Sequence, residues 1–223
     1  MEKLKNIVYD PEFWFVLIFN AFLAWGYTDR LFSFDTIVWI YFFQSVLLGI
    51  GNAVRMAFLR DFTAENFTIN GQQAVSKSKT KWASIVFFLV HYGFFHFVYL
   101  IFLIVGSINN GSKLDFKVVM VNLIVIAGNT LISVWSNILR DRENPPSISF
   151  LFFVPYLRVV PMHVFIILGF SMKNKVLLTL PYFGLIDLFW LFLLLKTFFD
   201  LLMHIIVQKS WRKQRPKPIG GYI

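Results

Sequence analysis

The fold of this protein is decided by long apolar stretches, of which Trp82–Gly106 is the plainest: it reads WASIVFFLVHYGFFHFVYLIFLIVG. This stretch contains no Asp, Glu, Lys or Arg, and histidine is its only residue type that titrates near neutral pH. A helix needs about 20 mostly apolar residues to cross the hydrocarbon core of a bilayer. The stretch therefore predicts a membrane-spanning helix.

Five more stretches of this kind are predicted to span the membrane: Phe13–Tyr27, Thr36–Leu59, Phe116–Leu139, Ser149–Met172 and Leu178–Val207. Hydrophobic residues make up 57% of the chain and charged residues 15%, against about 45–50% and about 25% in soluble domains. This composition excludes a soluble enzyme and a nucleic-acid-binding domain, and the absence of cysteine excludes a disulfide scaffold. We predict an all-α polytopic bundle of six transmembrane helices, with one domain over residues 1–207 and a basic tail over 208–223.

Lysine and arginine set the predicted orientation, because cytoplasmic loops of membrane proteins carry an excess of them. Placing the N-terminus inside puts the basic segments 59–81, 140–146 and 208–223 on the cytoplasmic side and leaves few bases outside. We therefore predict an N-in/C-in, multi-pass protein of a prokaryotic cytoplasmic (inner) membrane. The expected partners are membrane lipids, including anionic headgroups at the basic tail, and not nucleic acid.

Ionisable residues recur inside the predicted spans, where each costs several kcal/mol unless it is paired. They are His91, His96, Arg158, His163, Asp187, Lys196, Asp200 and His204. Lys196, Asp200 and His204 are spaced by four residues and so share one face of a helix. A rise of about 1.5 Å per residue brings His91 and Arg158 to a similar depth. The sequence predicts a polar pocket in the cytoplasmic half of the bundle.

Polar stripes in the second and fourth predicted spans bear on this pocket. They consist of Gln44, Asn52 and Arg55, and of Asn122, Asn129, Ser133, Ser136 and Asn137. The stripes could line the pocket, or they could hydrogen-bond between helices as amide and small side chains do in membranes; the second interpretation is favoured. Pro155 and Pro161 flank Arg158 and predict a kink in the fifth span.

A metal-binding site is the most specific function that the cluster of ionisable residues predicts. Imidazole and carboxylate groups are ligands of zinc, and catalytic zinc keeps three protein ligands and an open water position. His91, Asp200 and His204 are the predicted ligands of one divalent metal ion, with zinc preferred and iron or manganese as alternatives. Haem held by His96 and His163, which match in depth, is disfavoured.

The same cluster predicts catalytic residues, since a bound metal ion can activate water for hydrolysis. His163 would be a fourth ligand or a base, and Arg158 and Lys196, with Arg55, would neutralise an anionic group such as a lipid phosphate or carboxylate. The leading prediction is a membrane-embedded hydrolase acting on a lipid or another membrane substrate. The alternatives are a non-enzymatic scaffold or binding protein, in which the Lys–Asp–His network only orients helices, and a transporter.

Several segments resemble a group of uncharacterised prokaryotic membrane proteins that are catalogued as a domain of unknown function. These segments are Gly49-Ile-Gly-Asn52, His91-Tyr-Gly93, Tyr156-Leu-Arg158 with His163 and Gly169, and Lys196-Thr-Phe-Phe-Asp200-Leu-Leu-Met-His204. The resemblance implies that His91, Arg158, His163, Asp200 and His204 belong together, and it implies no activity. Gln44 stands where the resemblance leads us to expect an acid. Six spans with an intramembrane histidine also resemble the rhomboid superfamily in outline, although the Gly-x-Ser-Gly protease motif is absent.

Overall fold

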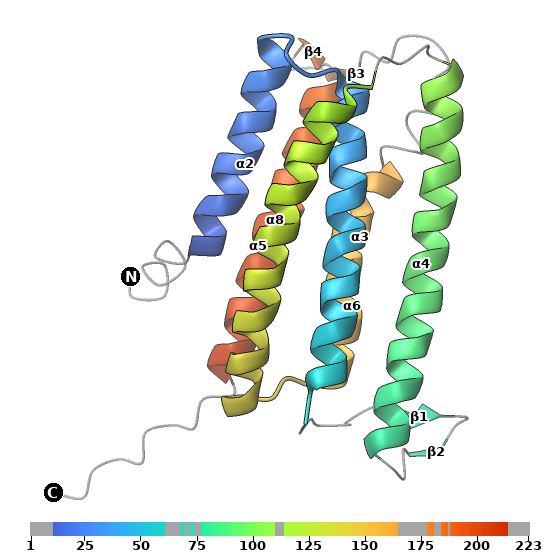
Figure 1. Cartoon of the computed structure of the whole chain (residues 1–223), viewed down its shortest axis with the longest axis vertical. Helices are drawn as coiled ribbons and strands as arrows, with labels where there is room; N and C mark the ends of the chain where they lie inside the picture. The colour runs from blue at the N-terminus through green and yellow to red at the C-terminus, as the bar shows by residue number, and fades with distance from the viewer. Residues whose placement is uncertain are drawn as a thin grey trace, which may run out of the picture.

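The structure is a computed structural model, and it describes residues 11–60, 68–69, 72–73, 77–109, 114–164, 178–180, 184–186 and 188–213. Its long helices are α2 (Pro11–Thr28), α3 (Phe34–Phe58), α4 (Lys77–Asn109), α5 (Phe116–Glu143) and α8 (Leu188–Lys213). Two shorter helices follow one another directly: α6 (Ile148–Phe153) and the 3-10 helix η1 (Val154–Arg158). Two antiparallel strand pairs lie at opposite ends of the bundle (Figure 1): β1 (Thr68–Ile69) with β2 (Gln72–Gln73), and β3 (Leu178–Leu180) with β4 (Gly184–Ile186).

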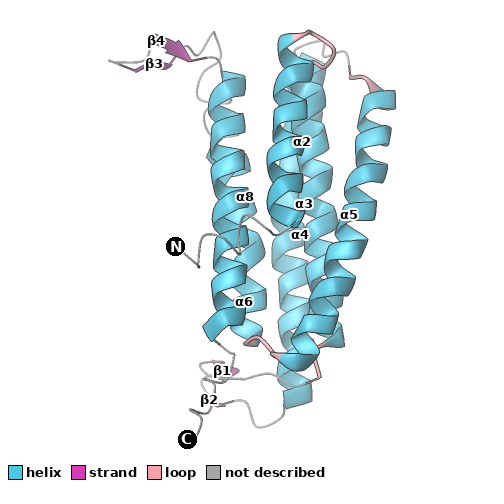
Figure 2. Ribbon diagram, turned by 90° about the vertical axis from the view of Figure 1, so that its left-hand side faces the viewer, coloured by secondary structure: helices cyan, strands magenta, loops and turns pink. Residues whose placement is uncertain are grey.

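Helix α3 is the central helix of the bundle. It packs against both α4 and α5 (Figures 1 and 2). Helix α8 packs against α2 and η1. Ile37, Ile40 and Tyr41 of α3 are almost completely buried, and the core continues into Phe189 and Phe192 of α8. Because neighbours surround α3, its polar side chains meet other helices instead of lipid.

Four helices in the described chain are long and apolar enough to cross a membrane: Phe34–Phe58, Ser78–Ile108, Phe116–Glu143 and Phe189–Val207. Two shorter apolar helices cover Phe13–Thr28 and Ile148–Val164. Large apolar side chains on α4 and α5 are more than half exposed, among them Phe87, Phe94, Phe97, Ile124, Leu131 and Trp135. Soluble monomers rarely expose an apolar surface of this extent. The structure therefore supports a multi-pass helical membrane protein, while the count of six spans and the orientation stay predictions.

Short polar side chains fix where several helices begin. The side-chain oxygens of Ser33, Asp115 and Ser147 accept hydrogen bonds, at 3.1, 3.1 and 3.2 Å, from the backbone N–H three residues further on. Such N-caps satisfy donors that the first turn of a helix leaves open. At the other end of α3, Lys81 Nζ donates to the backbone carbonyl of Ala57 at 3.1 Å. This bond ties the start of α4 to the end of α3.

The sixth predicted span is corrected by the structure. The sequence predicts a helix over Leu178–Val207, but β3 and β4 form an antiparallel pair and α8 begins only at Leu188. Hydropathy does not separate an apolar strand from an apolar helix, although Pro181 lacks the N–H that a helix interior needs. At its other end α8 continues to Lys213, into the segment predicted as tail. Asp187 lies outside the described residues.

The fifth predicted span, Ser149–Met172, is irregular where the sequence predicts a kink. Helix α6 gives way to the 3-10 helix η1, which has Pro155 at its start and Arg158 at its end. Apolar helix then continues to Val164, and residues 165–172 lie outside the described part. The 3-10 turn lets η1 present Arg158 to α8.

Gly49 allows α3 and α4 to approach closely, and its replacement gives a first testable prediction. A methyl group at Gly49 would overlap the ring of Tyr92, a buried residue of α4. We expect Gly49→Ala to lower the free energy of unfolding by about 1–3 kcal/mol, the usual cost of overpacking a core. Unfolding in mild detergent, followed by circular dichroism, measures the change.

Gly93 supplies the matched control on α4, because a methyl group there meets nothing within 4 Å. We expect Gly93→Ala to be neutral or to stabilise by up to about 1 kcal/mol, since alanine favours helix over glycine. Equal stabilities of the two variants would contradict the close approach of α3 and α4.

Candidate functional site

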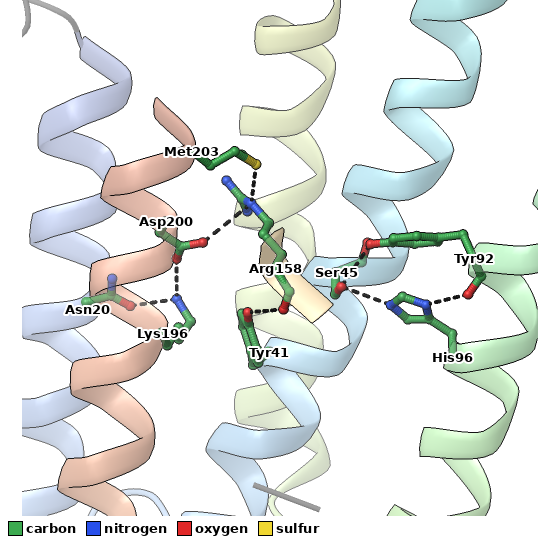
Figure 3. Close-up of polar contacts among 9 residues, drawn as sticks. All are labelled: Asn20, Tyr41, Ser45, Tyr92, His96, Arg158, Lys196, Asp200 and Met203. Atoms are coloured by element: carbon green, nitrogen blue, oxygen red, sulfur yellow. Dashed lines mark hydrogen bonds and ion pairs between the residues drawn. The ribbon is translucent and has the colours of Figure 1, made fainter. Parts of the chain in front are cut away.

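A buried pair of opposite charges on α8 forms the centre of the site. Lys196 and Asp200 lie one turn apart, with Nζ 2.9 Å from Oδ2, and the two residues are 0% and 1% exposed. Lys196 Nζ also donates to Oδ1 of Asn20 on α2 at 2.7 Å and lies 4.9 Å from the ring centroid of Tyr41 on α3 (Figure 3). Three helices therefore meet at one ammonium group.

Arg158 brings a second basic group to the same carboxylate. Its Nε lies 3.4 Å from Oδ1 of Asp200 and donates to Sδ of Met203 at 3.3 Å, while its backbone carbonyl accepts a hydrogen bond from the Tyr41 hydroxyl at 2.7 Å (Figure 3). In their ordinary protonation states Lys196, Arg158 and Asp200 carry one positive charge in excess. Within the described ranges the two terminal Nη atoms of Arg158 have no hydrogen-bond partner. The excess positive charge of the trio therefore lies next to the N–H donors of Arg158 that have no partner in these ranges.

A cavity of about 130 Å³, with a polar wall on one part and apolar side chains on the rest, adjoins this cluster. Its polar wall comes from α3, α5, η1 and α8: Gln44, Asn52, Arg55, Asn129, Thr130, Ser133, Asn137, Arg158, Asp200 and His204. One water molecule needs about 10–15 Å³ of such space, so the cavity can take a small polar group together with water. The wall residues of α3, α5 and α8 lie from about the middle of each helix toward its C-terminal end. The sequence predicts a polar pocket toward the same end of these helices.

The polar stripes of α3 and α5 both contribute to the cavity wall. Asn52 Nδ2 donates to the backbone carbonyl of Leu151 in α6 at 2.8 Å, so this residue also holds two helices together, as the favoured interpretation predicts. Asn137 Nδ2 donates to Oγ of Ser133 at 3.3 Å. By contrast, Gln44 Oε1 and Asn137 Oδ1 are buried acceptors without a hydrogen-bond partner in the described part of the chain.

Arg55 and Asp141 form a second buried ion pair, between the ends of α3 and α5. Arg55 Nε and Nη2 donate to the two carboxylate oxygens of Asp141 at 2.5 and 2.7 Å, and each residue is 6% exposed. Two parallel charge-assisted bonds of this kind are strong and directional. The sequence predicts Arg55 as a cation for the ligand and places Asp141 just beyond the fourth predicted span, Phe116–Leu139. In the structure α5 runs to Glu143, so Asp141 is helical and neutralises Arg55.

The four histidines do not meet at one place. His204 on α8 lines the cavity. His91 on α4 has its Nδ1 2.7 Å from the hydroxyl of Tyr156, and His163 forms a hydrogen bond with the hydroxyl of Tyr99. The tyrosines were not predicted as partners of the histidines, because the spacing of the tyrosines in the sequence carries no distinct signal.

His96 belongs to a third polar arrangement, between α3 and α4. Its Nε2 is 2.9 Å from Oγ of Ser45, and its Nδ1 is 2.9 Å from the carbonyl oxygen of Tyr92 (Figure 3). The Tyr92 hydroxyl donates to the backbone carbonyl of Ser45 at 2.9 Å. This network satisfies the polar atoms of His96 and joins the central helix to α4.

The predicted metal ligands are only partly brought together. Asp200 and His204 share the cavity wall on α8, whereas His91 lies on α4 beside Tyr156. Among the residues that the structure describes, no three His, Asp or Glu side chains form a group that could hold a metal ion. The zinc, iron or manganese site stays a prediction from the sequence, without support from the geometry.

Of the predicted catalytic residues, Arg158 and Lys196 are brought to one carboxylate, whereas His163 lies beside Tyr99. Sequence reasoning missed Asn20, which accepts a hydrogen bond from the lysine. A signal for it existed, because Asn20 is the only amide side chain within Phe13–Tyr27.

Comparison with protein families gives a match over most of the chain. Residues 5–217 match a family that is described as a family of unknown function (DUF6498). Neither the curated proteins nor the solved structures contain a significant match to this sequence. The predicted resemblance to an uncharacterised family is confirmed, and no function comes with it.

Proposed function

This chain belongs to the family of unknown function DUF6498, and we propose that it binds an anionic group inside its helical bundle. The observation that carries the proposal is the buried trio of Lys196, Arg158 and Asp200, in which two basic side chains share one carboxylate next to a cavity with a partly polar wall. An unbalanced charge at membrane depth is costly and points to a functional site. A bound anion would balance it.

The chemistry of the wall narrows the class of ligand. Arg158 offers unused guanidinium donors, and the planar fork of arginine matches the oxygens of a carboxylate or a phosphate. The buried acceptors Gln44 Oε1 and Asn137 Oδ1 call for hydroxyl or N–H donors, or for water. An oxyanion that carries hydroxyl groups meets both requirements. A glycerol phosphate headgroup of a membrane lipid has this composition, and a free phosphate with water is the other source of the same chemistry.

Binding is the step that a lipid hydrolase and a transporter would share for such a ligand, so the proposal is for binding and not for turnover. The proposal retains the predicted N-in/C-in orientation of the protein in a prokaryotic inner membrane. In that orientation the cavity faces the cytoplasmic side, where anionic headgroups attract basic residues.

The test is ligand-dependent stabilisation. We expect either phosphatidylglycerol or inorganic phosphate to raise the unfolding temperature of the purified protein in neutral detergent, because a ligand at 100 times its Kd stabilises the folded state by about 2.7 kcal/mol. Arg158→Gln should abolish the shift, whereas Arg140→Gln on the exposed end of α5 should keep it. Phosphatidylcholine, which is zwitterionic and has no net charge, serves as the lipid control.

The pattern of responses identifies the source of the anion. A shift with phosphatidylglycerol alone assigns the site to a lipid headgroup, and a shift with inorganic phosphate assigns it to the free ion. No shift with either anion, or the same shift in Arg158→Gln, would overturn the proposal.

A further inference from the structure

A second cavity, of about 260 Å³, lies where α3 and α5 end. Its lining residues are Arg55, Phe58, Leu59, Arg60, Ile138, Asp141 and Arg142. Arg60 and Arg142 are exposed, and within the described ranges neither makes a hydrogen bond or an ion pair. The outer cavity is therefore electropositive, with a single carboxylate that is already engaged by Arg55.

Arg55 belongs to the walls of both cavities. Asp141, its partner, lines only the outer cavity, whereas Arg158 lines only the inner one. The buried ion pair of Arg55 and Asp141 therefore stands between the inner and the outer space. Arginines follow one another from the exposed end of the bundle inward, in the order Arg60 and Arg142, then Arg55, then Arg158.

We propose that the outer cavity is a second binding site for the same anionic group, and that the Arg55–Asp141 pair is the gate between the two sites. This inference rests on the proposed function. A row of like charges in a cleft raises the local concentration of ions of opposite sign. An arriving carboxylate or phosphate offers Arg55 the same bidentate geometry as Asp141 does, so it can replace that carboxylate without leaving the guanidinium unpaired.

Thiol accessibility tests the gate, and the chain suits this method because it contains no cysteine. Ser133→Cys places a thiol in the wall of the inner cavity. We expect Asp141→Asn to raise its rate of modification by a negatively charged methanethiosulfonate reagent at least about tenfold, which corresponds to about 1.4 kcal/mol. In the same Asp141→Asn variant, a positively charged reagent of the same size should modify Ser133→Cys more slowly than the negatively charged reagent does. Adding the anion that stabilises the protein should slow the modification.

Ser136→Cys is the matched control, since Ser136 lies on the same helix and lines neither cavity. Its rate of modification should not change with Asp141→Asn. The exchanged pair Arg55→Asp with Asp141→Arg should restore slow modification of Ser133→Cys. If Asp141→Asn does not fold, Arg55→Gln with Asp141→Asn removes both charges and should show the same acceleration.

Two results would overturn the gate: an unchanged rate in the folded variants, or an equal acceleration for both reagents. The rate of thiol modification does not depend on Arg158. The experiments can therefore reject the gate without rejecting the inner anion site, or the reverse. Anion stabilisation that depends on Arg158, together with unchanged labelling, would retain the inner site and reject the gate. Faster labelling by the anionic reagent without anion stabilisation would reject the inner site.

Discussion

Asp200→Asn should lower the free energy of unfolding by about 3–5 kcal/mol, because removing one partner of a buried ion pair leaves an uncompensated charge. Asp200 faces two basic groups, Lys196 Nζ at 2.9 Å and Arg158 Nε at 3.4 Å. Asparagine keeps the shape of the side chain, so the change removes mainly its charge. Denaturant titration in mild detergent, followed by circular dichroism, measures the loss.

Lys196→Met provides the comparison that isolates charge balance. It removes a residue that is just as buried, but it leaves Arg158 and Asp200 as a balanced pair. We expect it to cost about 1–3 kcal/mol, chiefly because Asn20 loses its hydrogen-bond donor. The double variant Lys196→Met with Asp200→Asn should be more stable than Asp200→Asn alone. If Lys196→Met is the more damaging single change, the trio does not carry excess positive charge.

Arg55→Met should destabilise the protein to a similar degree, by about 3–5 kcal/mol, because it strands a buried carboxylate. Asp141 receives two hydrogen bonds from Arg55, at 2.5 and 2.7 Å, and is 6% exposed. Methionine retains most of the apolar stem of arginine, so loss of packing contributes little. The same denaturant titration provides the measurement.

Two further variants distinguish the effect of the Arg55–Asp141 ion pair from that of the neighbouring residues. Arg55→Met with Asp141→Leu should recover most of the stability, since a buried ion pair can be replaced by apolar residues at little or no cost. Arg140→Met, at an exposed position next to Asp141, should change the stability by no more than about 0.5 kcal/mol. If Arg55→Met with Asp141→Leu is as unstable as Arg55→Met alone, the fold at the ends of α3 and α5 requires the charges of Arg55 and Asp141.

The parts of the fold that the sequence predicts well are those governed by length and hydropathy. The stretch Trp82–Gly106 lies within α4, and Phe116–Leu139 lies within α5. The pairing of Lys196 with Asp200 follows from their spacing alone, because side chains four residues apart on a helix are neighbours. The segment β3–β4 is as apolar as a helix, so hydropathy alone does not identify it.

The parts that the sequence does not predict depend on how helices are rotated about their axes. Counting residues gives the depth of a side chain but not the direction in which it points. His91 matches the depth of the cluster on α8, yet its Nδ1 lies 2.7 Å from the hydroxyl of Tyr156 in η1. Arg55 and Asp141 are 86 residues apart in sequence, and no local pattern connects them.

This separation has a consequence for how the protein is made. Arg55 enters the membrane with α3, 86 residues before its partner Asp141 is synthesised, and Asn20 precedes Lys196 by 176 residues. At about 5–20 residues per second, the arginine waits roughly 4–17 s and the asparagine roughly 9–35 s. During co-translational insertion the early helices therefore hold unpaired polar groups for seconds. They are expected to stay near the insertion machinery until α8 arrives and completes the bundle.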